Sequence, residues 1–175
     1  PKAEGLTPMG DALRMARRMV RSWCKKHPDS FPPIVINITD GEFNNSTHDE
    51  RVQLANEIKS LYTTDGNVLM FNVHISPRGT ESVSFPVDRA ELNGNRYAGE
   101  LFELSSLLPQ IYNERIARMK SIPMDKRLVA MSVNADMQQL VKIMVDADMA
   151  KVAVERASEH ITTNLVEYLE KGIVK

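Results

Sequence analysis

The stretch Pro33-Ile34-Val35-Ile36-Asn37-Ile38-Thr39-Asp40-Gly41-Glu42 decides the fold of this chain. It begins with a short run of β-branched apolar residues that shows little polar alternation. Such a run predicts a strand buried on both faces, as in parallel sheets. The run stops at the carboxylate of Asp40. Because ligands bind beyond the carboxyl ends of the strands in open α/β sheets, Asp40 is predicted to lie at the functional edge.

Helical and extended patterns alternate around this strand. Thr7-Pro8 is a typical helix start, and apolar residues recur at helical spacing from Met9 to Cys24. Two further apolar runs predict strands over 68–75 and 128–133. Further helices are expected over about 49–62, 97–108 and 109–120, and from 134 onward. Residues 76–95 are predicted to form a long irregular loop.

This alternation predicts an α/β fold, Rossmann-like, in three layers, with a mostly parallel sheet and helices on both faces. Few strands are expected for so many helices, so the sheet is predicted to lack its amino-terminal strands. We expect one main domain over residues 1–149 and a carboxyl-terminal helical extension over residues 150–175.

The composition bounds the function. The 175 residues include 22 basic and 23 acidic side chains, a balance that argues against a general nucleic-acid binder. The single cysteine, Cys24, excludes an intrachain disulfide and gives no sign of an oxidising compartment. No apolar stretch approaches the roughly 18–20 residues of a membrane span. We therefore expect a cytoplasmic protein that binds neither nucleic acid nor membrane.

Two segments together resemble the metal-ion-dependent adhesion site of von Willebrand factor A domains. Gly5-Leu6-Thr7-Pro8-Met9 precedes an amphipathic helix, as the second loop of that site does. Thr39-Asp40-Gly41 ends an apolar strand, as the third loop does. The resemblance covers residues 1–75, and residues 128–145 fit the last unit of the family more loosely. It is closest to bacterial, apparently intracellular members that occur as accessory or scaffold proteins.

The resemblance implies a site for a divalent cation, with Thr7 and Asp40 as ligands. Mg²⁺, or Mn²⁺ or Ca²⁺ in its place, prefers oxygen ligands such as hydroxyls and carboxylates. An open coordination position would take an acidic side chain of a protein partner, and Glu42 and Asn44 are candidate partner contacts.

One departure from the family weakens the expected site. The Asp-x-Ser-x-Ser loop of the family does not occur in this chain, so the cation site is expected to be partial and to hold Mg²⁺ poorly. Three explanations of the missing strand stay open. A longer chain was trimmed, another chain supplies the missing part, or the fragment folds with an uncapped sheet edge, which invites a homodimer.

The main hypothesis is a non-enzymatic interaction or scaffold module. The alternatives are an α/β hydrolase or phosphotransfer-type enzyme that uses Asp40 at the strand edge, and a metal-free structural or oligomerisation fragment. The sequence shows no nucleophile elbow, no phosphate-binding Gly-rich loop and no paired catalytic carboxylates, which disfavours catalysis. Two simpler readings stay open, with Thr7 as a plain helix N-cap and Asp40 as a turn residue.

Overall fold

The computed structural model describes residues 8–40, 43, 46–75 and 82–134. The chain divides into two compact units, Pro1–Asp136 and Met137–Lys175, and all the described residues belong to the first. The expected domain boundary at residue 149 and the helix expected beyond residue 134 lie outside the described residues.

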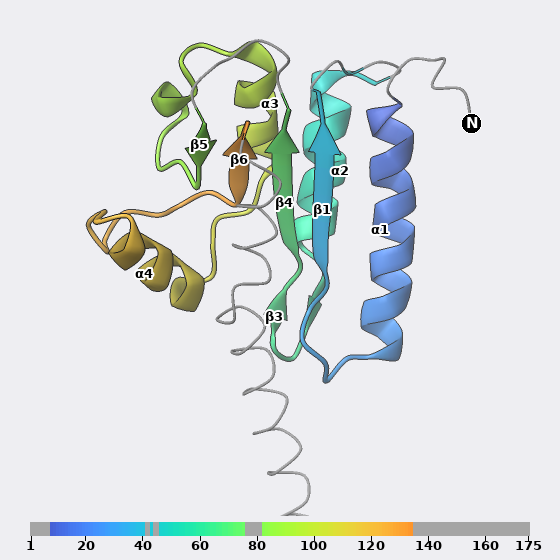
Figure 1. Cartoon of the computed structure of the whole chain (residues 1–175). Helices are drawn as coiled ribbons and strands as arrows, with labels where there is room; N and C mark the ends of the chain where they lie inside the picture. Colours follow the sequence, from blue (N-terminus) through green and yellow to red (C-terminus); the bar gives the residue numbers. More distant parts are fainter. Residues whose placement is uncertain (1–7, 41–42, 44–45, 76–81, 135–175) are drawn as a thin grey trace, which may run out of the picture. The chain divides into compact units, whose positions relative to one another are not determined.

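A four-stranded sheet forms the centre of the described unit, with the strand order β1-β4-β6-β5 (Figure 1). Strands β1 (Ile34–Thr39), β4 (Leu69–His74) and β6 (Met131–Val133) are parallel to one another. Strand β5 (Val83–Ser84) runs antiparallel to β6. The predicted α/β class is therefore confirmed, and the sheet is mixed.

Three helices cover one face of this sheet. They are α1 (Met9–Lys26), α2 (His48–Lys59) and α3 (Arg96–Leu104). A fourth helix, α4 (Gln110–Met119), follows α3 in the chain. These helices lie within a few residues of the predicted ones, because the sequence provides their start signals. The side chain of Thr47 accepts a hydrogen bond from the backbone of Glu50, as an N-cap of α2.

Two predicted boundaries were wrong because strand pairing replaces the expected structure, within a hairpin in one case and between distant segments in the other. Residues 60–62 do not continue α2, since β2 (Tyr62–Thr63) pairs with β3 (Gly66–Asn67) in a hairpin. Gly66 has φ +132° in this turn, a conformation that favours glycine. The predicted loop over 76–95 contains β5 and a 3₁₀ helix, Arg89–Leu92, and β5 forms only through its contact with β6.

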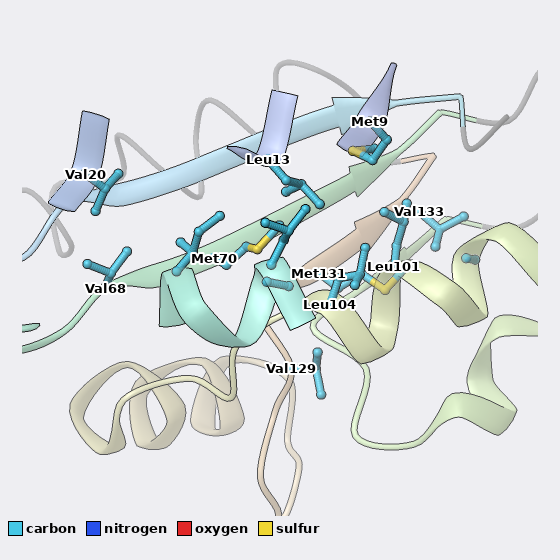
Figure 2. Close-up of a cluster of buried hydrophobic side chains, with 14 of the residues drawn as sticks. Met9, Leu13, Val20, Val68, Met70, Leu101, Leu104, Val129, Met131 and Val133 are labelled. Atoms are coloured by element: carbon cyan, nitrogen blue, oxygen red, sulfur yellow. The ribbon is translucent and has the colours of Figure 1, made fainter. Parts of the chain in front are cut away.

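The hydrophobic core lies between the three helices and the sheet face that they cover (Figure 2). Burial of this apolar surface is the main force that holds the two layers together. Figure 2 labels ten of its side chains, namely Met9, Leu13, Val20, Val68, Met70, Leu101, Leu104, Val129, Met131 and Val133.

Strand β1 departs from the prediction that both of its faces are buried. Ile34, Ile36 and Ile38 retain exposed fractions of 38%, 41% and 49%. In contrast, every residue of β4 is buried. The difference follows from position, because β1 is the terminal strand of the sheet among the described residues. An apolar run predicts a strand but does not show how many neighbours cover it.

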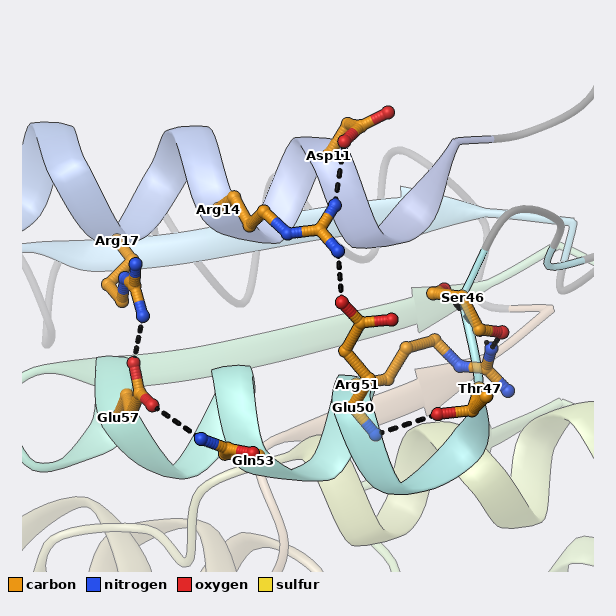
Figure 3. Close-up of polar contacts among 9 residues, drawn as sticks. All are labelled: Asp11, Arg14, Arg17, Ser46, Thr47, Glu50, Arg51, Gln53 and Glu57. Atoms are coloured by element: carbon orange, nitrogen blue, oxygen red, sulfur yellow. Dashed lines mark hydrogen bonds and ion pairs between the residues drawn. The ribbon is translucent and has the colours of Figure 1, made fainter.

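Two ion pairs join α1 to α2 (Figure 3). The Arg14 guanidinium binds the Glu50 carboxylate, and the Arg17 guanidinium binds the Glu57 carboxylate. The contact with Glu50 raises the pKa of Arg14, and the hydrogen bond from Arg17 lowers the pKa of Glu57. These two ion pairs hold α1 beside α2.

A row of polar side chains crosses the buried face of the sheet. The Asn37 amide donates to Asn72 Oδ1 at 2.8 Å, and the Asn72 amide donates to Ser105 Oγ at 2.9 Å. Asn37 and Asn72 are register partners in β1 and β4, and Asn72 is fully buried. A slip of one residue would move every side chain to the opposite face and break this row. The row therefore fixes the register of β1 on β4.

Replacing Asn72 with leucine tests this role. Asn72→Leu should lower the free energy of unfolding by about 1–3 kcal/mol, because it leaves buried polar groups without partners. Asn56→Leu, at an exposed position of α2, is the matched control and should change it by less than about 0.5 kcal/mol. Urea unfolding followed by circular dichroism measures both. Equal effects of the two substitutions would show that the row has no special role.

Candidate functional site

The carboxyl ends of β1, β4 and β6 meet at one edge of the sheet, because the three strands are parallel. The residues that follow them are Asp40, Ile75 and Asn134. Asp40 is exposed. The Asn134 backbone N–H donates to the carbonyl of His74 at 2.8 Å, and Asn134 adopts φ +46°. Asp40 thus lies at the carboxyl edge predicted from sequence, but it follows a terminal strand.

His74, the last residue of β4, lies beneath this edge and is 2% exposed. Its Nε2 is 3.3 Å from Asn95 Nδ2. The Asn95 side-chain oxygen accepts from the backbone of Ala98 as the N-cap of α3, which orients the amide nitrogen toward the ring. Nε2 must then accept, so the proton of the neutral ring is on Nδ1. Within the described part of the chain, Nδ1 makes no hydrogen bond.

Burial lowers the pKa of His74, while the nearby Thr39 carbonyl and the Asp40 carboxylate act in the opposite direction. Because the effect of burial is the largest of the three, the structure favours the neutral imidazole.

His74 should make stability depend on pH. Between its lowered native pKa and the unfolded value of about 6.5, the unfolded chain binds a proton that the native chain does not. The free energy of unfolding should fall as the pH drops below the unfolded pKa of about 6.5, by at most about 1.4 kcal/mol per pH unit. Urea unfolding at pH 7, 6 and 5 measures this slope. His74→Gln should flatten it, whereas His27→Gln, at an exposed ring, should leave it unchanged.

A buried arginine supports the segment that follows Asp40. Arg51 in α2 donates through Nη2 to Glu100 Oε2 at 2.6 Å and through Nη1 to the Ser46 carbonyl at 2.5 Å. Its guanidinium carbon lies 4.9 Å from the ring centroid of Phe43. Figure 3 shows Arg51 reaching Ser46 at the start of α2. Arg51 therefore ties α3 to two points of the loop after Asp40.

The first turn of α1 contacts the same loop. A Cβ atom on Gly10 would lie 2.8 Å from the Cβ of Ser46, closer than side chains approach. Glycine at this position lets α1 lie against Ser46, while Arg51 holds Ser46 from α2. Ser46 is thus held from two elements. Sequence reasoning missed this support because Arg51 and Glu100 lie 49 residues apart and no local pattern links them.

Breaking this buried pair should destabilise the protein strongly. Arg51→Met leaves the Glu100 carboxylate without its main cation in a site with little exposure, which should remove about 3–5 kcal/mol of unfolding free energy. The double variant Arg51→Met with Glu100→Leu should recover most of that loss. Denaturant unfolding of both variants measures the difference. A double variant as unstable as Arg51→Met would contradict this account of the pair.

Of the predicted site residues, only Asp40 is described. Thr7, Glu42 and Asn44 lie outside the described residues. Among the residues that the structure describes, no group of three or more His, Cys, Asp or Glu side chains could hold a metal ion. Mg²⁺ requires a near-octahedral set of oxygen ligands, part of which water can supply. Asp40 carries one carboxylate, and Thr7, the second predicted ligand, lies outside the described residues.

No family model, no curated protein and no solved structure matches this chain. In the described part of the chain, no helix is long and apolar enough to cross a membrane. Function is therefore inferred from the geometry and chemistry of the sheet edge.

Proposed function

We propose that this protein is a non-enzymatic interaction module that binds a protein partner at the carboxyl edge of its sheet. One observation carries the proposal. Asp40 is exposed directly after β1, at the edge where the ends of three parallel strands meet. This edge is the usual ligand site of open α/β sheets.

The carboxylate of Asp40 suits recognition through a shared divalent cation. Mg²⁺ or Mn²⁺ bound there would keep open positions, and an acidic side chain of the partner would occupy one of them. Thr7 is the second proposed ligand, and Glu42 and Asn44 are the proposed partner contacts. A von Willebrand factor A-like, Rossmann-like fold is part of this proposal. The parallel pairing of β1 with β4 and the helix before β1 are compatible with it.

Two contacts lie in the segment that follows Asp40. Arg51 lies over the ring of Phe43 and donates to the carbonyl of Ser46. The neutral His74 beneath the edge adds no positive charge that would oppose a cation. These features support Asp40 as the recognition carboxylate.

Titration with Mn²⁺ and Mg²⁺ by calorimetry tests the proposal. The unmodified protein should bind the cation, and Asp40→Ala should weaken binding at least about tenfold, equivalent to about 1.4 kcal/mol. Asp125→Ala removes an exposed carboxylate elsewhere in the chain and should bind as the unmodified protein does. The absence of binding at millimolar cation, or equal binding by Asp40→Ala, would exclude a cation site at this carboxylate.

A further inference from the structure

The turn before α3 contains a sequence that is prone to spontaneous chemical change. Asn93 and Gly94 form the only Asn-Gly pair in the 175 residues, and both are exposed. Asn93 is the C-cap of the 3₁₀ helix Arg89–Leu92. An asparagine amide reacts most readily with the backbone nitrogen of a following glycine, because glycine has no Cβ to obstruct the approach. This pair is therefore a candidate modification site.

The backbone of the pair leaves the Gly94 nitrogen accessible. Asn93 and Gly94 are both left-handed, with φ +51° and +71°. A Cβ on Gly94 would meet no atom within 4 Å beyond its chain neighbours. Among the described residues, the Gly94 N–H makes no hydrogen bond. Rotation of the peptide between the two residues therefore breaks no described hydrogen bond of this N–H and meets open space.

We propose that Asn93 deamidates spontaneously in the folded protein. The Gly94 nitrogen attacks the side-chain carbonyl carbon of Asn93 and forms a C–N bond. The bond from that carbon to the amide nitrogen breaks, and ammonia leaves with the proton that Gly94 loses. Water then opens the cyclic succinimide. Opening at the side-chain carbonyl gives aspartate, and opening at the backbone carbonyl gives isoaspartate.

The two products differ in what they do to the chain. Both replace a neutral amide with a carboxylate, which is favourable close to the N-terminus of α3 because of the helix dipole. Isoaspartate also lengthens the main chain by one CH₂ group, since the backbone then runs through the former side chain. We expect aspartate to be tolerated and isoaspartate to shift the chain that enters α3.

Asn95 is the residue that this shift reaches first. Its side-chain oxygen accepts from Ala98 N at 3.1 Å as the N-cap of α3. Its Nδ2 lies 3.3 Å from His74 Nε2, at the end of β4. The cap and the contact with the imidazole depend on the position of one side chain, two residues after the reacting asparagine. Isoaspartate should therefore weaken both together.

The reaction makes the carboxyl edge of the sheet sensitive to the age of the protein. Water is the one co-reactant, so the chain itself sets the rate. An aged molecule keeps Asp40 but loses the contact that orients His74 beneath it. The inference concerns the turn before α3 and does not depend on a cation at Asp40.

Another exposed asparagine provides an internal control. Asn67 precedes Val68, whose branched side chain shields its nitrogen. The Val68 N–H also donates to the Leu61 carbonyl at 2.8 Å, and Asn67 Nδ2 donates to the Lys59 carbonyl at 3.1 Å. Asn67 should therefore keep its amide under conditions that convert Asn93.

Peptide mapping of the aged protein tests the modification. The folded protein is incubated at mildly alkaline pH, and aged and fresh samples are digested with trypsin. Fragment ions of the peptide 90–96 distinguish Asn93 from Asn95 by mass spectrometry. The mass increase from replacing NH₂ with OH should appear at Asn93 at least about tenfold faster than at Asn67. An isoaspartyl methyltransferase with a labelled methyl donor should label the aged peptide.

Nuclear magnetic resonance tests the effect on α3. In the isoaspartate form, the Ala98 amide should exchange at least about tenfold faster than in fresh protein, because its cap is weakened. The ¹⁵N chemical shift of His74 Nε2 should also change. Asn93→Asp is the matched control, since it adds the charge without the CH₂ group, and it should leave both readouts unchanged. Circular dichroism checks that the protein stays folded during incubation.

Either of two results would overturn the proposal. The first is conversion of Asn93 in the folded protein that is no faster than conversion of Asn67. The second is an isoaspartate form whose Ala98 exchange and His74 chemical shift equal those of Asn93→Asp, since the turn would then be uncoupled from the edge.

Discussion

The parallel pairing of β1 with β4 is the constraint on which the rest of the structure depends. The hydrogen bond between the side chains of Asn37 and Asn72 fixes its register. This register sends the carboxyl ends of both strands to one edge, so Asp40 follows β1 where His74 ends β4. It also gives the residues of β1 two orientations. The N–H and C=O groups of alternate residues bond to β4, and those of the other residues face away from β4. One pairing thus determines both the position of Asp40 and the backbone groups of β1 that face away from β4.

The two surfaces have different physical characters. The carboxyl edge presents an exposed carboxylate above a buried histidine, and Arg51, which pairs with Glu100, contacts Phe43 and Ser46 beyond it. The other side of β1, beside which no described strand lies, presents the half-exposed side chains of Ile34, Ile36 and Ile38.

The sequence predicted the elements better than their environment. The apolar run before Asp40 identified β1 and the position of its carboxyl end, because a strand and its stop signal are local. The exposure of Ile36 was not predictable, since it depends on which strands lie beside β1. Strand β5 and the Arg51–Glu100 pair were missed for the same reason, as each joins residues distant in the chain. The cation site itself stays a proposal, with Thr7, Glu42 and Asn44 outside the described residues.

Amide hydrogen exchange along β1, followed residue by residue by nuclear magnetic resonance, tests the central claim most directly. If β1 pairs only with β4 in the stated register, the amides of Val35, Asn37 and Thr39 should exchange slowly. The amides of Ile34, Ile36 and Ile38 should exchange fast, because they face away from β4, on the side where no described strand lies. Slow exchange at all six positions, or protection of the isoleucines in place of their neighbours, would contradict this pairing.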